Sequence, residues 1–159
     1  MKRILPDESA TGDLGRDLAA ALTADASVPG QGAVIYLHGS LGAGKTSLAR
    51  ALLRALGETG PVRSPTYTLM EPYEVAGLTV WHMDLYRLGD PEELEFLGIR
   101  ELDTASAVML VEWPENGAGL LPSADLSIRL THLQQGREAV VEASGSRGEA
   151  LMKGLSVSG

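Results

Sequence analysis

The sequence has no cysteine, which excludes disulfide bonds and any zinc site built on thiolates. It also has no apolar run near the ~18 residues that a membrane-spanning helix needs. Its beginning, MKRILPDESA, lacks the apolar core of a signal peptide. We therefore expect a protein without a membrane segment that works in the reducing cytoplasm.

A net positive charge is missing as well. The 159 residues carry 13 Lys and Arg against 21 Asp and Glu, a net charge of −8. Most of the acidic excess lies in residues 84–115, which hold nine acids and two arginines. Because affinity for nucleic acid comes mainly from Lys and Arg on phosphates, we expect this chain to act on nucleic acid only beside a basic partner.

The length predicts one domain over residues 1–159. Residues 144–159 are rich in Gly and Ser, and we expect them to form a mobile tail with at most one short helix near Ala150.

The most informative motif lies at residues 39–46. They read Gly-Ser-Leu-Gly-Ala-Gly-Lys-Thr, a full match to GxxxxGK[ST], the phosphate-binding loop (P-loop) of nucleoside-triphosphate enzymes. The apolar residues 33–37 before it are typical of a buried strand, and residues 47–56 after it have apolar side chains at helical spacing, with Gly57 as C-cap. This order of strand, loop and helix is the context that the motif requires.

The residue types in this loop explain how it holds a phosphate. Glycines let the backbone approach a ligand, so that its N–H groups converge at a helix N-terminus. Lys45 supplies a positive charge for the β- and γ-phosphates, and Thr46 offers a hydroxyl to Mg²⁺. A glycine-rich turn that binds nothing is the alternative. The loop residues that we expect to contact the nucleotide are Leu41, Gly42, Ala43, Gly44, Lys45 and Thr46.

The rest of the chain predicts an α/β fold. A helix capped by Ser9 carries an apolar stripe from Leu14 to Leu22, and a second, acidic helix begins at Asp90. The predicted remaining segments are a turn at 26–32, strands at 67–73 and 78–83, a buried strand at 107–111, and a hairpin of 126–133 with 137–143. The alternation of strands and helices favours a P-loop NTPase-like fold: a mostly parallel central sheet flanked by helices, with an antiparallel addition.

Two acids directly follow predicted strands. Asp84 follows the strand at 78–83, and Glu112 follows the apolar run at 107–111. In such sheets ligands bind at the carboxyl ends of the strands. A P-loop enzyme needs a carboxylate for Mg²⁺ and a group that orients the attacking water, so Lys45, Asp84 and Glu112 are the predicted catalytic residues. The alternatives are a helix cap or an ion pair for Asp84, and a solvated strand end for Glu112.

Other polar side chains leave two interpretations open. Thr66 is either a switch threonine that reaches the γ-phosphate or metal, or part of a proline turn. Trp113 either covers the nucleotide site or faces a partner, or it packs in the core. Arg63, Arg87 and Arg137 are candidates to neutralise transition-state charge or to form surface ion pairs. The three histidines, at 38, 82 and 132, lack metal-ligand spacing and are interpreted as structural.

The motifs together resemble a known family. Gly-Ala-Gly-Lys-Thr at 42–46, Ser-Pro-Thr-Tyr at 64–67, His-Met-Asp-Leu-Tyr-Arg-Leu at 82–88 and Val-Glu-Trp-Pro-Glu at 111–115 occur in this order. Leu94-Glu95, Leu97-Gly98 and Gly136-Arg137 also fit. Over about residues 9–143 the chain closely resembles the bacterial TsaE (YjeE) family, small ATPases of the tRNA threonylcarbamoyladenosine pathway.

The resemblance implies a compact, cytoplasmic P-loop protein that binds ATP or ADP with Mg²⁺. It also implies two partner proteins, TsaD and TsaB, with which the family modifies the adenosine following the anticodon, so that tRNA is met only through the complex. ATP hydrolysis would support turnover of that complex. By motif, Thr46 and Glu112 would ligate Mg²⁺, and Asp84 and Lys45 would lie at the phosphates. Thr11, Glu115 and Arg137 would contact the nucleotide.

Three other classes of nucleotide-binding protein are alternatives to an ATPase of this family. A small-molecule kinase needs an arginine-rich lid, but residues 90–103 carry six acids and one arginine. A GTPase needs an NKxD-type base reader, and the sequence has none. A nucleotide-gated interaction module that does not hydrolyse ATP would present the same residues, and turnover with and without partners separates it from an ATPase.

Overall fold

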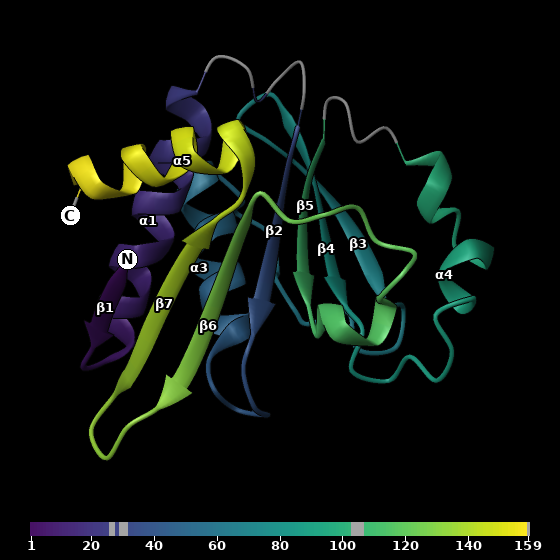
Figure 1. Ribbon diagram of the computed structural model, residues 1–159, viewed down its shortest axis with the longest axis horizontal. Helices are drawn as coiled ribbons and strands as arrows, with labels where there is room; N and C mark the ends of the chain where they lie inside the picture. The colour runs from purple at the N-terminus through teal and green to yellow at the C-terminus, as the bar shows by residue number, and fades with distance from the viewer. Residues whose placement is uncertain (26–27, 29–31, 103–106, 159) are drawn as a thin grey trace.

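A seven-stranded sheet forms the centre of the molecule (Figure 1). The structure is a computed structural model and describes residues 1–25, 28, 32–102 and 107–158. Its strand order is β1-β7-β6-β2-β5-β4-β3. The strands are β1 (Lys2–Leu5), β2 (Ala33–His38), β3 (Met70–Val75), β4 (Leu78–Asp84), β5 (Ala107–Glu112), β6 (Leu126–His132) and β7 (Arg137–Ala143).

The sheet is mixed: the predicted parallel centre and antiparallel addition are both present, but three strands and not one small addition pair antiparallel. The central strands β6, β2, β5 and β4 are parallel to their neighbours in this group, and β3, β7 and β1 pair antiparallel at the two sides. The two hairpins, β3–β4 and β6–β7, were expected from the sequence and are confirmed. Strand β1 was missed, because four residues at a chain end give too short a pattern to recognise.

One face of the sheet is covered by three helices, α1 (Glu8–Ala24), α3 (Lys45–Leu56) and α5 (Gly145–Ser158). Apolar side chains of these helices and of all seven strands form the larger core cluster. The stripe predicted for the first helix is buried, but the helix begins earlier than expected. Its N-cap is Asp7, whose carboxylate accepts from the N–H of Ala10, and not Ser9.

The other face carries a smaller core over β2, β4 and β5. It is covered by the segment that holds α4 (Glu93–Phe96) and a 3₁₀ turn (Ile99–Glu101), and by the segment after β5, which begins with a second 3₁₀ turn (Pro114–Gly117). The predicted acidic helix over 90–97 is reduced to these four residues of α4, because tight i+3 hydrogen bonds begin at Asp90 and Gly98 takes a left-handed φ of 76°.

Helix α5 differs from the mobile tail with a short helix that was expected. It spans 14 residues and packs on α1 and β7. Leu151 and Leu155 are buried in the larger core, and Gly154 lies so close to Ala21 of α1 that a side chain there would be tight. The glycines that suggested mobility therefore permit close packing.

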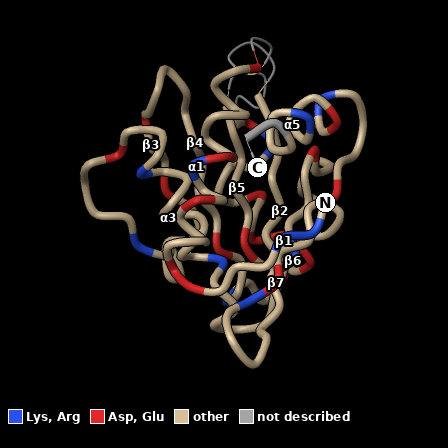
Figure 2. The backbone as a smooth tube through the Cα atoms, turned by 90° about the vertical axis from the view of Figure 1, so that its left-hand side faces the viewer, with Lys and Arg blue, Asp and Glu red and all other residues tan. Residues whose placement is uncertain are grey.

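Charge is mixed on the side of the molecule formed by β1 and β7. Figure 2 shows basic and acidic positions interspersed there, and Lys2–Glu138 and Arg3–Asp17 are ion pairs, at 3.1 and 2.6 Å. Among the described residues, no helix combines the length and the apolarity needed to cross a membrane. The turn expected at 26–32 lies mostly outside the described residues.

Candidate functional site

The 39–46 loop leaves the carboxyl end of β2 and enters α3 at Lys45. This confirms the predicted order of strand, loop and helix. Gly44 is the N-cap of α3 and has a φ of 108°, a region that favours glycine. A Cβ at this position would also collide with Nη1 of Arg137. The backbone conformation therefore favours glycine here, and a side chain at this position would displace the guanidinium of Arg137.

A cavity of about 180 Å³ opens at this loop; we call it the loop cavity. It brings together residues from α3, from the end of β5 and from the start of β7. The lining residues are Leu41, Gly42, Gly44, Lys45, Thr46, Ser47, Glu112, Trp113 and Arg137. All but Ser47 were considered as site residues from the sequence. Ala43, which was also expected to contact the nucleotide, is fully buried in the core.

Lys45 is held in place by its own loop. Its Nζ donates to the carbonyl oxygens of Gly39 and Ser40 at 2.7 and 2.8 Å, and lies 4.3 Å from the ring centroid of Trp113. Burial lowers the pKa of Lys45, and the nearby carboxylates of Glu112, Asp84 and Glu115 raise it in the opposite direction. The charge is thus placed in a partly desolvated site, where it acts strongly on an anion.

Trp113 lines the loop cavity. It has a φ of 56°, which is unusual for a residue other than glycine. Its ring packs against Tyr86 with a centroid distance of 5.0 Å. The ring also packs against the smaller core, so Trp113 both lines the loop cavity and belongs to the packing of this face of the sheet.

Both carboxylate oxygens of Glu112 have a side-chain partner. Its Oε1 accepts from the hydroxyl of Thr46 at 2.8 Å, and its Oε2 lies 2.6 Å from Nε2 of His82. Glu112 is 2% exposed and His82 is 0% exposed. Since a buried carboxylate is costly without hydrogen bonds, these two partners explain why an acid can end a buried strand. The solvated strand end is therefore wrong for Glu112.

Asp84 lies beside Glu112. The two residues are register partners at the ends of β4 and β5. One carboxylate oxygen of Asp84 accepts from the hydroxyl of Ser64, and the other accepts from the N–H of Tyr86 at 3.0 Å. Both oxygens therefore have a fixed direction.

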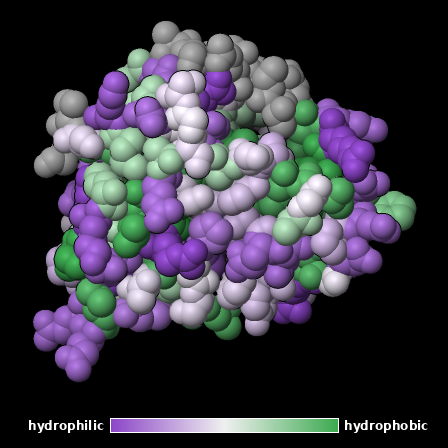
Figure 3. Space-filling view, viewed as in Figure 1, coloured by the Kyte–Doolittle hydropathy of each residue, from purple (hydrophilic) through white to green (hydrophobic). Residues whose placement is uncertain are grey.

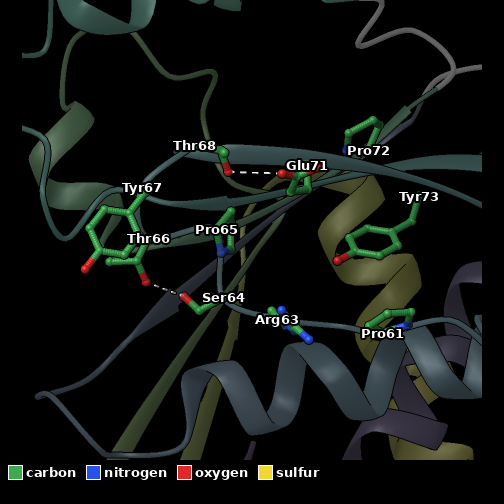
Figure 4. Close-up of a pocket in the computed structure, with 10 residues that line it drawn as sticks. All are labelled: Pro61, Arg63, Ser64, Pro65, Thr66, Tyr67, Thr68, Glu71, Pro72 and Tyr73. Atoms are coloured by element: carbon green, nitrogen blue, oxygen red, sulfur yellow. Dashed lines mark hydrogen bonds between the residues drawn. The ribbon is translucent and has the colours of Figure 1, made fainter.

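Thr66 lies in a different place from the loop cavity. It lines a second cavity of about 490 Å³ between the segment before β3 and β3 itself, shown in Figure 4. Its hydroxyl donates to Oγ of Ser64 at 3.2 Å. Because Ser64 in turn donates to Asp84, Thr66 is connected to the site through one intervening hydroxyl.

The three candidate arginines are separated in the structure. Arg137 lines the loop cavity; its Nη2 is 3.2 Å from Oε1 of Glu8, at the start of α1. Among the described residues its buried Nη1 has no hydrogen-bond partner. Arg87 lies over the ring of Tyr67 at 4.7 Å, and Arg63 lines the second cavity. Arg137 alone is therefore placed to meet a ligand of the loop.

Two more residues that were predicted to contact the nucleotide lie outside the loop cavity. Glu115 is exposed and lies 3.5 Å from Nδ1 of His38; burial lowers the pKa of that imidazole, and Glu115 raises it. Thr11 is buried in α1, and its hydroxyl points to the carbonyl oxygen of Asp7. Neither residue lines the loop cavity.

Sequence reasoning missed the contact of His82 and the role of Ser64. His82 contacts Glu112, and Ser64 donates to Asp84. For His82 there was a usable signal: it precedes Asp84 by two positions on the same strand, so the two side chains share a face. Ser64 gave no such signal, because only the folded loop brings it to Asp84.

Comparisons with known proteins point to one family. Residues 5–139 match the model of the family described as threonylcarbamoyl adenosine biosynthesis protein TsaE. The chain is 45% identical to a tRNA threonylcarbamoyladenosine biosynthesis protein TsaE of Haemophilus influenzae, over 77% of this chain and 78% of that one. It is 39% identical to the protein of the same name from Bacillus subtilis, over 86% and 85%. Among solved structures, Bacillus subtilis YdiB superposes with a TM-score of 0.79 at 31% identity, covering 99% of this chain and 94% of that one.

Proposed function

Since this chain belongs to the TsaE family of threonylcarbamoyladenosine biosynthesis, we propose that it is a magnesium-dependent ATPase with a P-loop NTPase-like fold. It supports modification of the adenosine that follows the anticodon in tRNA. Its catalytic residues are Lys45, Asp84 and Glu112.

The observation that carries the proposal is the convergence of the loop, Glu112 and Arg137 on one cavity. The backbone of the loop and the first turn of the 12-residue helix α3 offer N–H donors to an anion. Lys45 adds a fixed positive charge, and Arg137 adds a buried donor that lacks a partner among the described residues. A donor set of this kind suits the phosphates of ATP or ADP.

The residues also fit a magnesium ion. Thr46 and Glu112 offer two adjacent oxygens in the loop cavity, and these two residues would hold Mg²⁺. Among the described residues no group of three or more acids and histidines could hold a metal by itself. Magnesium commonly takes one or two protein oxygens and completes its shell with phosphate and water, and when bound it neutralises charge on the phosphates.

Asp84 is suited to a different task. Its carboxylate lies beside Glu112 but accepts from Ser64 and Tyr86 instead of from Thr46. We assign to Asp84 the orientation of the attacking water at the γ-phosphate. The family motifs assign Glu115 and Thr11 to the nucleotide pocket, and Thr11, which is 1% exposed, would reach a nucleotide only after a local rearrangement. Thr66 acts at the γ-phosphate through Ser64, as a switch threonine would.

The partners in this proposal are the TsaD and TsaB proteins, and tRNA is reached only through their complex. The net charge of −8 supports this restriction, because an acidic chain repels the phosphates of tRNA. The protein works in the cytoplasm, where tRNA is modified.

Calorimetry and a hydrolysis assay test the proposal. We expect ADP to bind more tightly in the presence of Mg²⁺, and GDP to bind more weakly than ADP, since the chain has no NKxD-type guanine reader. We also expect ATP hydrolysis that increases when TsaD and TsaB are added. Tight nucleotide binding without any hydrolysis, alone or with the partners, would identify a nucleotide-gated interaction module instead. No nucleotide binding would refute both interpretations.

A further inference from the structure

His82 lies directly behind the carboxylate that the proposal assigns to magnesium. Its ring is fully buried on β4, and its Nε2 is 2.6 Å from Oε2 of Glu112. His82 does not line the loop cavity, whereas Glu112 does. The imidazole therefore contacts Glu112 without lining the cavity in which a ligand would bind.

The two oxygens of Glu112 have different partners. Oε1 accepts from Thr46 on α3, and Oε2 meets His82 on β4. An ionised carboxylate only accepts hydrogen bonds, so the proton of the second bond lies on Nε2. Two donors from two different elements thus fix the plane of the carboxylate. Neither donor alone would prevent rotation about the last side-chain bond.

The second ring nitrogen of His82, Nδ1, indicates that the contact between Nε2 and Glu112 accounts for a histidine at this position. Nδ1 is buried and has no hydrogen-bond partner among the described residues. Elsewhere on this face of β4, the core positions are apolar, with Leu78 and Val80 in the larger cluster. Burying a polar ring among such residues costs stability unless it is hydrogen-bonded. The bond to Glu112 is the one polar interaction of the ring that offsets this cost within the described part of the chain.

We propose that His82 is a positioning residue that orients Glu112 for magnesium. It holds Oε2 so that the carboxylate presents its remaining oxygen beside the hydroxyl of Thr46. Groups of this kind, which hold a metal ligand without touching the metal, typically change metal affinity by about 10- to 100-fold. The inference rests on the proposed function, because it presupposes that Glu112 is a magnesium ligand.

Two matched variants test the inference. In His82→Gln the amide nitrogen is as many bonds from Cα as Nε2 is, so the variant can still donate to Glu112. In His82→Asn the amide nitrogen is one bond closer to Cα, so it takes the place of Nδ1 and does not reach Glu112. Both are neutral amides in the same buried position. A purely structural role would affect both variants, while a positioning role separates them.

The measured quantity is the ratio of the Kd for ADP without Mg²⁺ (in EDTA) to the Kd with saturating Mg²⁺, from calorimetry. We expect the parent and His82→Gln to have a similar ratio, and His82→Asn to lose about 10-fold or more of it. The Kd in EDTA should be nearly the same in all three proteins. Thermal unfolding without nucleotide confirms that each variant is folded. A parent-like ratio in His82→Gln supports the inference whatever the stability of His82→Asn.

The possible failures are distinguishable. If the parent itself shows no effect of Mg²⁺ on ADP binding, the proposed magnesium site fails, whatever the variants do. If the parent shows the effect and His82→Asn retains all of it, His82 does not position Glu112, and the proposed function stands. Equal loss in the Gln and Asn variants would also overturn the inference, because the donor at Nε2 would then be irrelevant.

Discussion

Asp84 and Glu112 are direct register partners at the ends of two adjacent parallel strands, yet among the described residues no hydrogen-bond donor serves both of them. Asp84 accepts from Ser64 and the N–H of Tyr86, whereas Glu112 accepts from Thr46 and meets His82. Two buried acids with separate donor sets are suited to separate functions.

The first prediction follows from this separation. Glu112→Gln should raise the magnesium concentration needed for ATP hydrolysis by roughly 10-fold or more, because a neutral amide is a poorer ligand for a hard cation. Asp84→Asn should lower turnover at saturating magnesium with less effect on nucleotide affinity. Magnesium titrations of the parent and both variants decide this. An unchanged magnesium requirement in Glu112→Gln would remove the metal role from that residue.

Lys45 should be essential for binding or turnover. Lys45→Ala removes the buried charge at the loop, and groups that stabilise developing charge contribute about 3 kcal/mol, or roughly 100-fold in rate. Hydrolysis rates and ADP affinity measure the effect. Lys153→Ala is the matched control, since Lys153 is an exposed residue of α5. If Lys45→Ala binds and hydrolyses like the control, the loop does not hold the phosphates.

Much of this site could be predicted from the sequence, because its residues follow strands. The pattern of apolar strand and polar successor located Glu112 and Asp84, and the glycine pattern located the loop with Lys45 and Thr46. What holds these residues could not be predicted. The contact of His82 with Glu112 joins two strands, and that of Ser64 with Asp84 joins a loop to a strand. Strand alternation places His82 on the same face as Asp84, but it does not identify Glu112 as the partner, and no local pattern identifies Ser64.

In the fold, too, the elements set by local sequence were predictable, and the elements that depend on distant segments were not. The two hairpins were predictable, because each has a short turn between alternating strands; the first turns at Ala76 and Gly77, both with positive φ. Strand β1 and the full length of α5 were not predictable. Each depends on a surface supplied by a distant part of the chain: β1 on β7, and α5 on α1 and β7.

Helix α5 should therefore contribute to stability. Leu155 is 0% exposed and belongs to the larger core, so Leu155→Ala should lower the free energy of unfolding by about 2–5 kcal/mol. Lys153→Ala, in the same helix, should change it by less than about 0.5 kcal/mol. Urea unfolding of the three proteins measures both. A loss in Leu155→Ala no larger than that in the control would mean that α5 does not pack as described.

The acidic segment around α4 should guide association with TsaD and TsaB. Glu92 and Glu93 are exposed, Phe96 is 90% exposed, and Glu95 pairs with Arg100 at 2.8 Å. The surface at the side of the molecule where α4 lies is mainly hydrophilic (Figure 3). An exposed aromatic side chain beside the exposed acids Glu92 and Glu93 suits a partner with a basic rim around an apolar pocket.

Charge reversal tests this docking surface. Glu92→Lys combined with Glu93→Lys should slow association with the partner pair and weaken its salt dependence, because exposed charges act chiefly on the rate of encounter. The control is Glu142→Lys with Glu149→Lys, which reverses two exposed charges elsewhere. Association rates at low and high salt give the answer. If both double variants associate equally fast at low salt, the partners dock elsewhere.

The central claim is that ATP hydrolysis at this loop sustains tRNA modification by TsaD and TsaB. The most direct measurement is the number of threonylcarbamoyl groups transferred to tRNA per TsaD–TsaB pair, with this protein and ATP present or absent. We expect many threonylcarbamoyl transfers per pair with the parent protein, and about one with Lys45→Ala or without the protein. Equal transfer in all three reactions, or full support by Lys45→Ala, would contradict it.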